Sequence, residues 1–283
     1  MRCLNPQCPA EIHDSLRVCA TCGRDNGCPN VRKAQEPAEV AALRNRLEEA
    51  ELRADARGAG QNLARFRDEV ADKSVAVLAM PASNALPLLN EDGQAFSNFY
   101  RLVEAGVRIP KPNWYDRFRG IADQLLFPHY AENIFFAALS LDRQGSPYYG
   151  TVSLSLAPFA ISDRATVFES NSLLFCRDRN LGLQSDVPPG YRAAWEDRGM
   201  IAASKLEPKL VPDTQPGEFS GILLEQKPTD DADFVEVHVY DRITRHSLSG
   251  VVIRRTGDPD TELFHALVRN ACSQKGLACE EVA

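Results

Sequence analysis

A carboxylate and an imidazole that could do chemistry together stand two residues apart within residues 233–241. Three valines alternate there with Glu236, His238 and Tyr240, which is the period-2 pattern of a strand with one face on a core. On such a strand Glu236 and His238 point the same way, about 7 Å apart. They could act as an acid–base pair or stabilise a positive charge. On pattern alone, a strand whose polar side faces water is the simpler interpretation.

Four cysteines near the N-terminus have the spacing of a structural metal site. Two close pairs, one with four intervening residues and one with two, are separated by ten residues; they are Cys3, Cys8, Cys19 and Cys22. Four thiolates in tetrahedral geometry close a structural Zn²⁺ site, so residues 1–35 are expected to form a zinc ribbon that needs metal to fold. Cys28 and His13 are left over, and either could replace one ligand. An iron–sulfur cluster is the weaker alternative, because the spacing matches no recognised cluster pattern.

Residues 36–72 have the apolar spacing of a helix. Leu43, Leu47 and Ala50 follow three- and four-residue steps, Gly58 and Gly60 interrupt the pattern, and it resumes at Leu63. We interpret this segment as a helical linker between the zinc ribbon and the rest of the chain. Two alternatives stay open: a coiled-coil spacer that forms a homodimer, and an amphipathic helix that lies on the next domain.

Residues 73–283 alternate strand and helix patterns, which predicts one α+β domain. Short apolar or alternating runs indicate strands, and longer amphipathic runs indicate helices. Strands are expected at 74–80, 134–141, 149–156 and 221–225, and helices at 86–107, 113–130, 191–205 and 260–273. The strands at 134–141 and 149–156 are expected to form an antiparallel hairpin. The strand at 221–225 is expected to pair with the Glu236 strand across a turn at 228–233.

Aromatic and basic side chains are interleaved in residues 99–119. They are Phe99, Tyr100, Arg101, Arg108, Lys111, Trp114, Tyr115, Arg117, Phe118 and Arg119. Such a mixture can bind phosphates and stack on bases, and the edge of an amphipathic helix needs the same residue types for packing and solubility. The sequence leaves both interpretations open.

Two motifs bear a family resemblance. The run from Glu236 to Thr244, Glu-Val-His-Val-Tyr-Asp-Arg-Ile-Thr, followed by Ser-Gly-Val-Val-Ile, is similar to the end of DNA-modifying ADP-ribosyltransferase toxins. The alternating strand from Tyr149, with Arg164-Ala-Thr after it, resembles the central strands of this superfamily in bacterial toxins and phage-associated effectors. The resemblance implies an ADP-ribosyltransferase-like mixed antiparallel β core with flanking helices, preceded here by the zinc ribbon and the helical linker.

The resemblance also implies roles for individual residues. Glu236 would be the catalytic carboxylate, Ser172 would support the pocket, and His238 would lie nearby. The residues implied to bind NAD are Arg117, Arg119, Arg164, Asn171 and Tyr149. Two departures bear on these roles: the family's early histidine or arginine anchor matches no single residue, and position 238 is histidine where many members have glutamine or glutamate.

The functional expectation is therefore an NAD-dependent ADP-ribosyltransferase, which is a glycosyltransferase acting on NAD. It would be a toxin or an anti-phage defence effector with a structural Zn²⁺, NAD as substrate, and a nucleic acid or a protein as acceptor. The alternative is a non-catalytic zinc-ribbon protein that binds nucleic acid or acts as an adaptor. Nothing in the sequence identifies the acceptor.

The bulk composition limits the classes of protein to which this chain could belong. The 283 residues are 44% hydrophobic and 25% charged, with a formal net charge of −7, so the chain is not a protein coated in positive charge. No run reaches the roughly 20 apolar residues of a membrane span, and no signal peptide precedes Cys3, which predicts a cytoplasmic protein with reduced cysteines. Cys272 and Cys279 have no close partner in the sequence that would argue for a second metal site.

Overall fold

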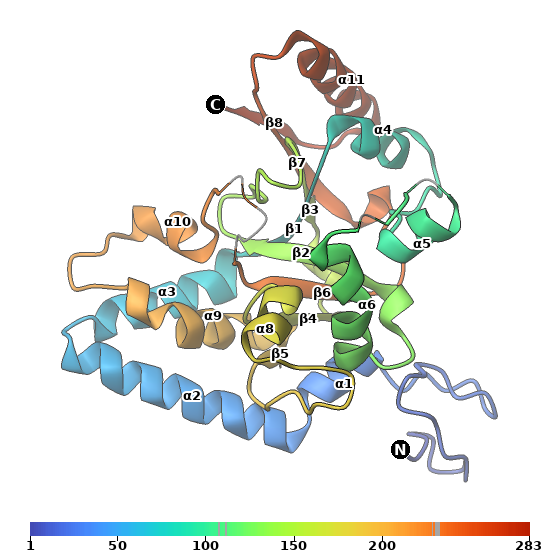
Figure 1. The fold of residues 1–283 in the computed structure, drawn as a ribbon, viewed down its shortest axis with the longest axis vertical. Helices are drawn as coiled ribbons and strands as arrows, with labels where there is room; N and C mark the ends of the chain where they lie inside the picture. Colours follow the sequence, from blue (N-terminus) through green and yellow to red (C-terminus); the bar gives the residue numbers. More distant parts are fainter. Residues whose placement is uncertain (107, 111, 228, 230–232) are drawn as a thin grey trace.

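A computed structural model describes residues 1–106, 108–110, 112–227, 229 and 233–283. Its centre is an eight-stranded sheet in the order β5-β4-β6-β2-β1-β3-β7-β8 (Figure 1). All neighbouring strands are antiparallel except β7 and β8, which are parallel. The strands are β1 (Val75–Met80), β2 (Ile134–Ser140), β3 (Val152–Leu156), β4 (Ala165–Phe168), β5 (Arg192–Ala194), β6 (Glu236–Tyr240), β7 (Leu248–Arg254) and β8 (Cys279–Val282).

Eleven α-helices within the described residues surround this sheet, so the protein is mixed α/β with a mostly antiparallel sheet. They are α1 (Pro29–Ala34), α2 (Pro37–Ala56), α3 (Gly60–Lys73), α4 (Ala82–Asn90), α5 (Phe99–Glu104), α6 (Trp114–Leu126), α7 (Pro158–Ile161), α8 (Ser172–Asp178), α9 (Arg198–Leu206), α10 (Phe219–Leu223) and α11 (Pro259–Lys275). The expectation of an antiparallel sheet with flanking helices is confirmed at this level. Within the described ranges, no helix is long and apolar enough to cross a membrane.

The sheet has a hydrophobic core on each face because successive strand residues point to opposite sides. On β2, Phe135 belongs to the larger core, which α2, α3 and α9 cover, and the preceding Ile134 belongs to a smaller core under α6 and α8. On β6, the valines face the larger core and the polar residues face the smaller one. The polar side of this strand therefore lies inside the protein.

The segment expected as a linker packs onto the sheet domain. It forms α2 and α3, and the predicted interruption is confirmed at Gly58, whose φ of +74° ends α2. Leu47, Leu63 and Phe66 are buried in the larger core, where α2 and α3 contact α9 (Figure 1). The apolar face that we considered for a coiled coil is thus covered within one chain.

The predicted hairpin of 134–141 with 149–156 is wrong. β1 lies between β2 and β3, with Val77 paired to Ala138 on one side and to Ser155 on the other. A strand flanked on both edges and covered on both faces needs a continuous apolar sequence, which β1 has. The apolar run 74–80 therefore indicated a central strand, but it did not indicate that β2 and β3 are the neighbouring strands.

Two other predicted elements differ in the structure. Residues 219–223 form helix α10, and the neighbours of β6 are instead β2 and β4. The helix expected over 86–107 is divided into α4 and α5, since Gly93 adopts a left-handed φ of +86° between them. Val107, and residues 228 and 230–232 of the expected turn, lie outside the described residues.

Candidate active-site pocket and metal centre

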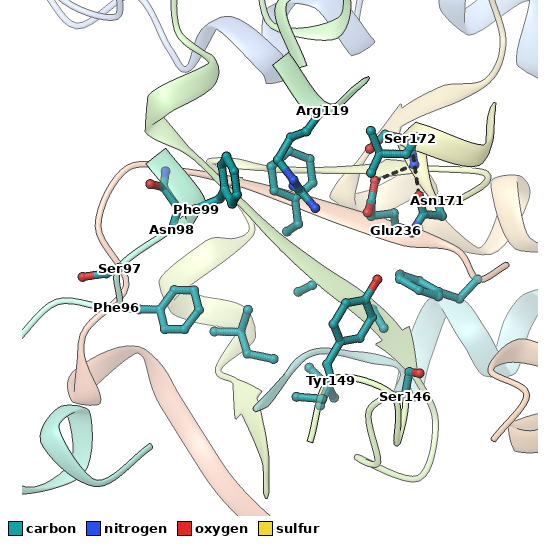
Figure 2. A pocket seen from close by; sticks show the side chains of 18 of the residues that line it. Phe96, Ser97, Asn98, Phe99, Arg119, Ser146, Tyr149, Asn171, Ser172 and Glu236 are labelled. Atoms are coloured by element: carbon teal, nitrogen blue, oxygen red, sulfur yellow. Dashed lines mark hydrogen bonds between the residues drawn. The ribbon is translucent and has the colours of Figure 1, made fainter. Parts of the chain in front are cut away.

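A cavity of about 210 Å³ opens on the sheet face that carries the polar side of β6. Glu236 enters it from β6, Ser172 and Asn171 from the start of α8, Arg119 from α6, and Tyr149 from the loop before β3. Figure 2 shows the guanidinium of Arg119 and the hydroxyl of Tyr149 pointing toward the middle of the cavity from opposite sides. Five residues singled out from the sequence therefore share one cavity, although they span more than a hundred residues of chain.

The carboxylate of Glu236 is held by two hydrogen bonds. It accepts from the backbone N–H of Ser172 at 3.0 Å and from Nε2 of His238 at 2.9 Å, and both bonds end on Oε2. Glu236 is only 4% exposed, so little water competes for these contacts. The interpretation that this side of the strand faces water is wrong. Since neither bond uses Oε1, that oxygen is available to a ligand in the cavity.

His238 lies behind the carboxylate among aromatic rings. The ring centroids of Phe127, Phe136 and Phe168 are 4.8, 5.3 and 5.6 Å from that of His238. At 2% exposure the imidazole reaches the cavity only through Glu236. Because a carboxylate can only accept, this contact places the His238 proton on Nε2 and fixes the direction of the Glu236 side chain.

A second acidic side chain, that of Asp123, lies next to Arg119, the cation that Figure 2 shows in the cavity. Asp123 on α6 is fully buried, accepts a hydrogen bond of 2.7 Å from the Tyr100 hydroxyl, and lies 3.9 Å from the Arg119 guanidinium. Burial raises the pKa of Asp123 to about 6, against the opposing effects of Arg119 and Tyr100. Asp123 therefore forms an ion pair with Arg119 one turn earlier on the same helix, and this pair helps to hold the guanidinium in position.

Two aromatic rings hold Arg119 from the sides. Its Cζ atom lies 5.3 Å from the centroid of Phe99 and 5.7 Å from that of Phe136. Arg108 contacts Phe99 as well, at 4.6 Å, and also lines the cavity. The stretch 99–119 thus supplies part of the pocket wall as well as packing. Binding of phosphates or bases by this stretch stays a prediction. Lys111 lies outside the described residues.

The other two predicted arginines lie away from this cavity. Arg117 is exposed on the outer side of α6. Arg164 lies at the far end of β6, where it donates to the backbone carbonyls of Ala160, Tyr240 and Asp241. Arg108 was named in the sequence only as one of the basic residues of 99–119, and Asp123 was not singled out. The spacing of Asp123 four residues after Arg119 was an available signal for a pair on one helix face.

The four N-terminal cysteines meet as the spacing predicted. Their sulfur atoms all lie within 4.8 Å of one another, with Cys3–Cys22 at 3.6 Å and Cys8–Cys19 at 3.9 Å. Zn–S bonds of about 2.3 Å in a tetrahedron place sulfur atoms about 3.8 Å apart. This cluster can hold a metal ion, and its donors and spacing are compatible with Zn²⁺.

The leftover residues have other positions. Cys28 is buried as the N-cap residue of α1, and His13 shares a hydrogen bond of 2.8 Å with Ser15. Two residues after Cys28, Asn30 donates from Nδ2 to the backbone carbonyls of Arg164 and His238. The metal-binding segment is therefore joined to the sheet through α1, directly at strand β6.

Comparison with models of known protein families gives no match for this chain, and a search of curated proteins finds no similar sequence.

Proposed function

We propose that this protein is an NAD-dependent ADP-ribosyltransferase with an ADP-ribosyltransferase-like core, and that Glu236 is its catalytic carboxylate. The observation that supports this most is the position of Glu236, a buried carboxylate that opens on a cavity which it shares with the cation of Arg119. Opposite charges at one cavity suit a substrate that develops a positive charge at one end and carries phosphates at the other.

The chemistry follows from the bond that has to break. The nicotinamide–ribose bond of NAD separates with its electron pair on the nicotinamide nitrogen, so positive charge builds on the ribose. A fixed carboxylate lowers the energy of that charge, and Oε1 of Glu236 would accept from a ribose hydroxyl. The acceptor atom then bonds to the same ribose carbon, and its proton passes to the carboxylate or to water.

The size of the cavity limits how NAD would bind. About 210 Å³ is less than the roughly 300 Å³ at which pockets begin to enclose a drug-sized ligand. The cavity would therefore enclose only part of NAD, the nicotinamide and its ribose, with the phosphates beside the lining cations. Arg119 and Arg108 are the lining cations that would contact the phosphates, and Tyr149 would pack against the nicotinamide end.

The remaining parts of the proposal concern the partners of the reaction. Zn²⁺ in the cysteine cluster would be structural, because four thiolates leave no open coordination position. The acceptor would be a nucleic acid or a protein, and the protein would act as a toxin or defence effector. Growth arrest on expression of the wild-type chain, absent for Glu236→Gln, would support that role.

The test measures nicotinamide release from NAD by the purified, zinc-loaded chain. Glu236→Gln keeps the shape of the side chain and removes its charge, so the rate should fall by about a hundredfold or more. Arg119→Ala should raise the KM for NAD about tenfold, since one charge-assisted contact is worth roughly 1.5 kcal/mol. Arg117→Ala is the matched control, because this arginine is exposed on the same helix and should leave KM unchanged.

Two results would overturn the proposal. One is a wild-type chain that neither binds NAD in calorimetry nor releases nicotinamide, which would favour a non-catalytic zinc-binding protein. The other is a Glu236→Gln variant with the wild-type rate. Equal effects of Arg119→Ala and Arg117→Ala would show that the phosphates do not meet this cavity.

A further inference from the structure

The two C-terminal cysteines, which lack a close partner in the sequence, are neighbours in the structure. Cys272 lies on the last turns of α11, and Cys279 begins β8 after a turn at Gly276. The backbone N–H of Leu277 donates to the carbonyl of Cys272 at 2.9 Å, which folds the chain back on the helix end. The register of β8 on β7 pairs Cys279 with Val251, whose side chain lies in the same larger core as Cys272. The side chains of Cys272 and Cys279 are therefore neighbours.

The two thiols differ in their surroundings. Cys272 is fully buried in the larger core, whereas Cys279 is exposed on an edge strand whose one neighbour is β7. The neighbouring Cys272 thiol lowers the pKa of Cys279 to about 7, with a smaller contribution from the nearby Arg269 cation. The same contact and burial raise the pKa of Cys272. One sulfur is therefore accessible and partly thiolate near neutral pH, and the other is a protected thiol beside it.

We propose that Cys279 and Cys272 form a reversible oxidation site, in which Cys279 reacts with a hydroperoxide and Cys272 closes a disulfide. This site is independent of the proposed transferase activity. It lies at the edge of the sheet opposite to β5 and away from the cysteine cluster, as the position of β8 shows (Figure 1).

The reaction proceeds in two balanced steps. The Cys279 thiolate attacks one oxygen of hydrogen peroxide, the O–O bond breaks, and hydroxide leaves, which gives a sulfenic acid on Cys279. The Cys272 sulfur then attacks the Cys279 sulfur, the S–O bond breaks, and hydroxide leaves with the Cys272 proton as water. Overall, two thiols are oxidised to a disulfide and one peroxide is reduced to two waters.

The Cys272–Cys279 disulfide should change the stability of the protein. The disulfide joins the end of α11 to β8, which is also held by its parallel pairing with β7 and by the ion pairs of Glu281 with Arg255 and Arg269. Closing a short loop removes conformational freedom from the unfolded chain. The oxidised protein should therefore show a higher Tm and slower proteolysis at its C-terminal strand than the reduced protein.

The test uses the full zinc-loaded chain, treated with hydrogen peroxide, then alkylated under denaturing conditions and digested with trypsin. Cleavage after Arg269 and Lys275 places the two cysteines on separate peptides, 270–275 and 276–283. A disulfide therefore appears as one linked species that separates on reduction. Cys176 is an internal control, since it is buried on α8 and its pKa is raised to about 12, so it should remain fully alkylated.

Two variants complete the test. Cys272→Ser should abolish the linked species and leave a sulfenic acid on Cys279 that a dimedone probe captures. Cys279→Ser should abolish both the linked species and the sulfenic acid. This position is exposed, so the substitution should preserve the fold. The proposal is overturned if both peptides of the wild-type chain remain alkylated after peroxide treatment, or if Cys279 over-oxidises as fast in the wild type as in Cys272→Ser.

Discussion

Asp123 is predicted to lower the stability of this protein at neutral pH. Its carboxyl group is fully buried beneath the cavity, and burial raises its pKa from 3.8 to about 6. An acid whose pKa is raised by folding favours the folded state most when it is protonated, below about pH 4. That contribution is lost progressively as the pH rises through 6, because the unfolded chain ionises more readily than the folded one.

The size of the effect follows from the shift. A difference of about two pKa units at 1.36 kcal/mol each gives on the order of 3 kcal/mol at pH 7.5. Asp123→Asn removes the ionisation and keeps an oxygen that can accept from the Tyr100 hydroxyl. Relative to the wild type, the variant should therefore gain about 3 kcal/mol between pH 4 and pH 7.5, or roughly 6–10 °C in Tm.

The assay compares urea or thermal unfolding of both proteins at the two pH values, so that all other titrating groups cancel. Asp68→Asn is the control, because this carboxylate is exposed and pairs with Arg67 in a surface contact. Its stability difference from the wild type should change by less than about 0.5 kcal/mol over the same range. The reasoning fails if the Asp123→Asn difference is the same at both pH values.

The same variant connects stability with the site. Asp123 lies next to Arg119 and should hold it in position, so Asp123→Asn should raise the KM for NAD while stabilising the fold. Such a compromise, in which a residue is kept although it costs stability, is common where function requires a buried charge.

Two further predictions concern the metal and the core. If the cluster binds Zn²⁺, Cys19→Ser should contain none by atomic absorption and should expose residues 1–28 to protease, as should a chelator. Cys28→Ser should bind as much Zn²⁺ as the wild type, because Cys28 lies outside the cluster. Phe66→Ala should cost about 3–5 kcal/mol in urea unfolding, since the ring is fully buried in the larger core. Leu52→Ala, at a side chain that is 71% exposed, should change stability by no more than about 0.5 kcal/mol.

Elements with strong local signals were predictable. The helix expected over 260–273 is observed as α11, because Asp258 caps its start and Gly276, with a φ of +66°, ends it. The apolar run 74–80 became β1. In each case the deciding interactions lie within a few residues of one another, so the local sequence contains them.

Local signals did not predict which strands are neighbours, or which of several similar residues reaches the cavity. Arg117, Arg119 and Arg164 were equal candidates in the sequence, yet only Arg119 reaches the cavity. The periodicity of β2 and β3 fitted a hairpin, but β1 lies between them. A strand pattern specifies which face is apolar, and pairing depends on segments that are distant in the chain.

The sequence by itself determined the cluster of four cysteines, since short spacings between cysteines restrict the backbone to knuckles that bring the sulfur atoms together. It also determined that Glu236 and His238 lie on one side of a strand. Only the tertiary structure decided that this side is the buried one, because α6 and α8, from two separate parts of the chain, cover it. Burial depends on what the rest of the chain places against a strand, and no local pattern records that.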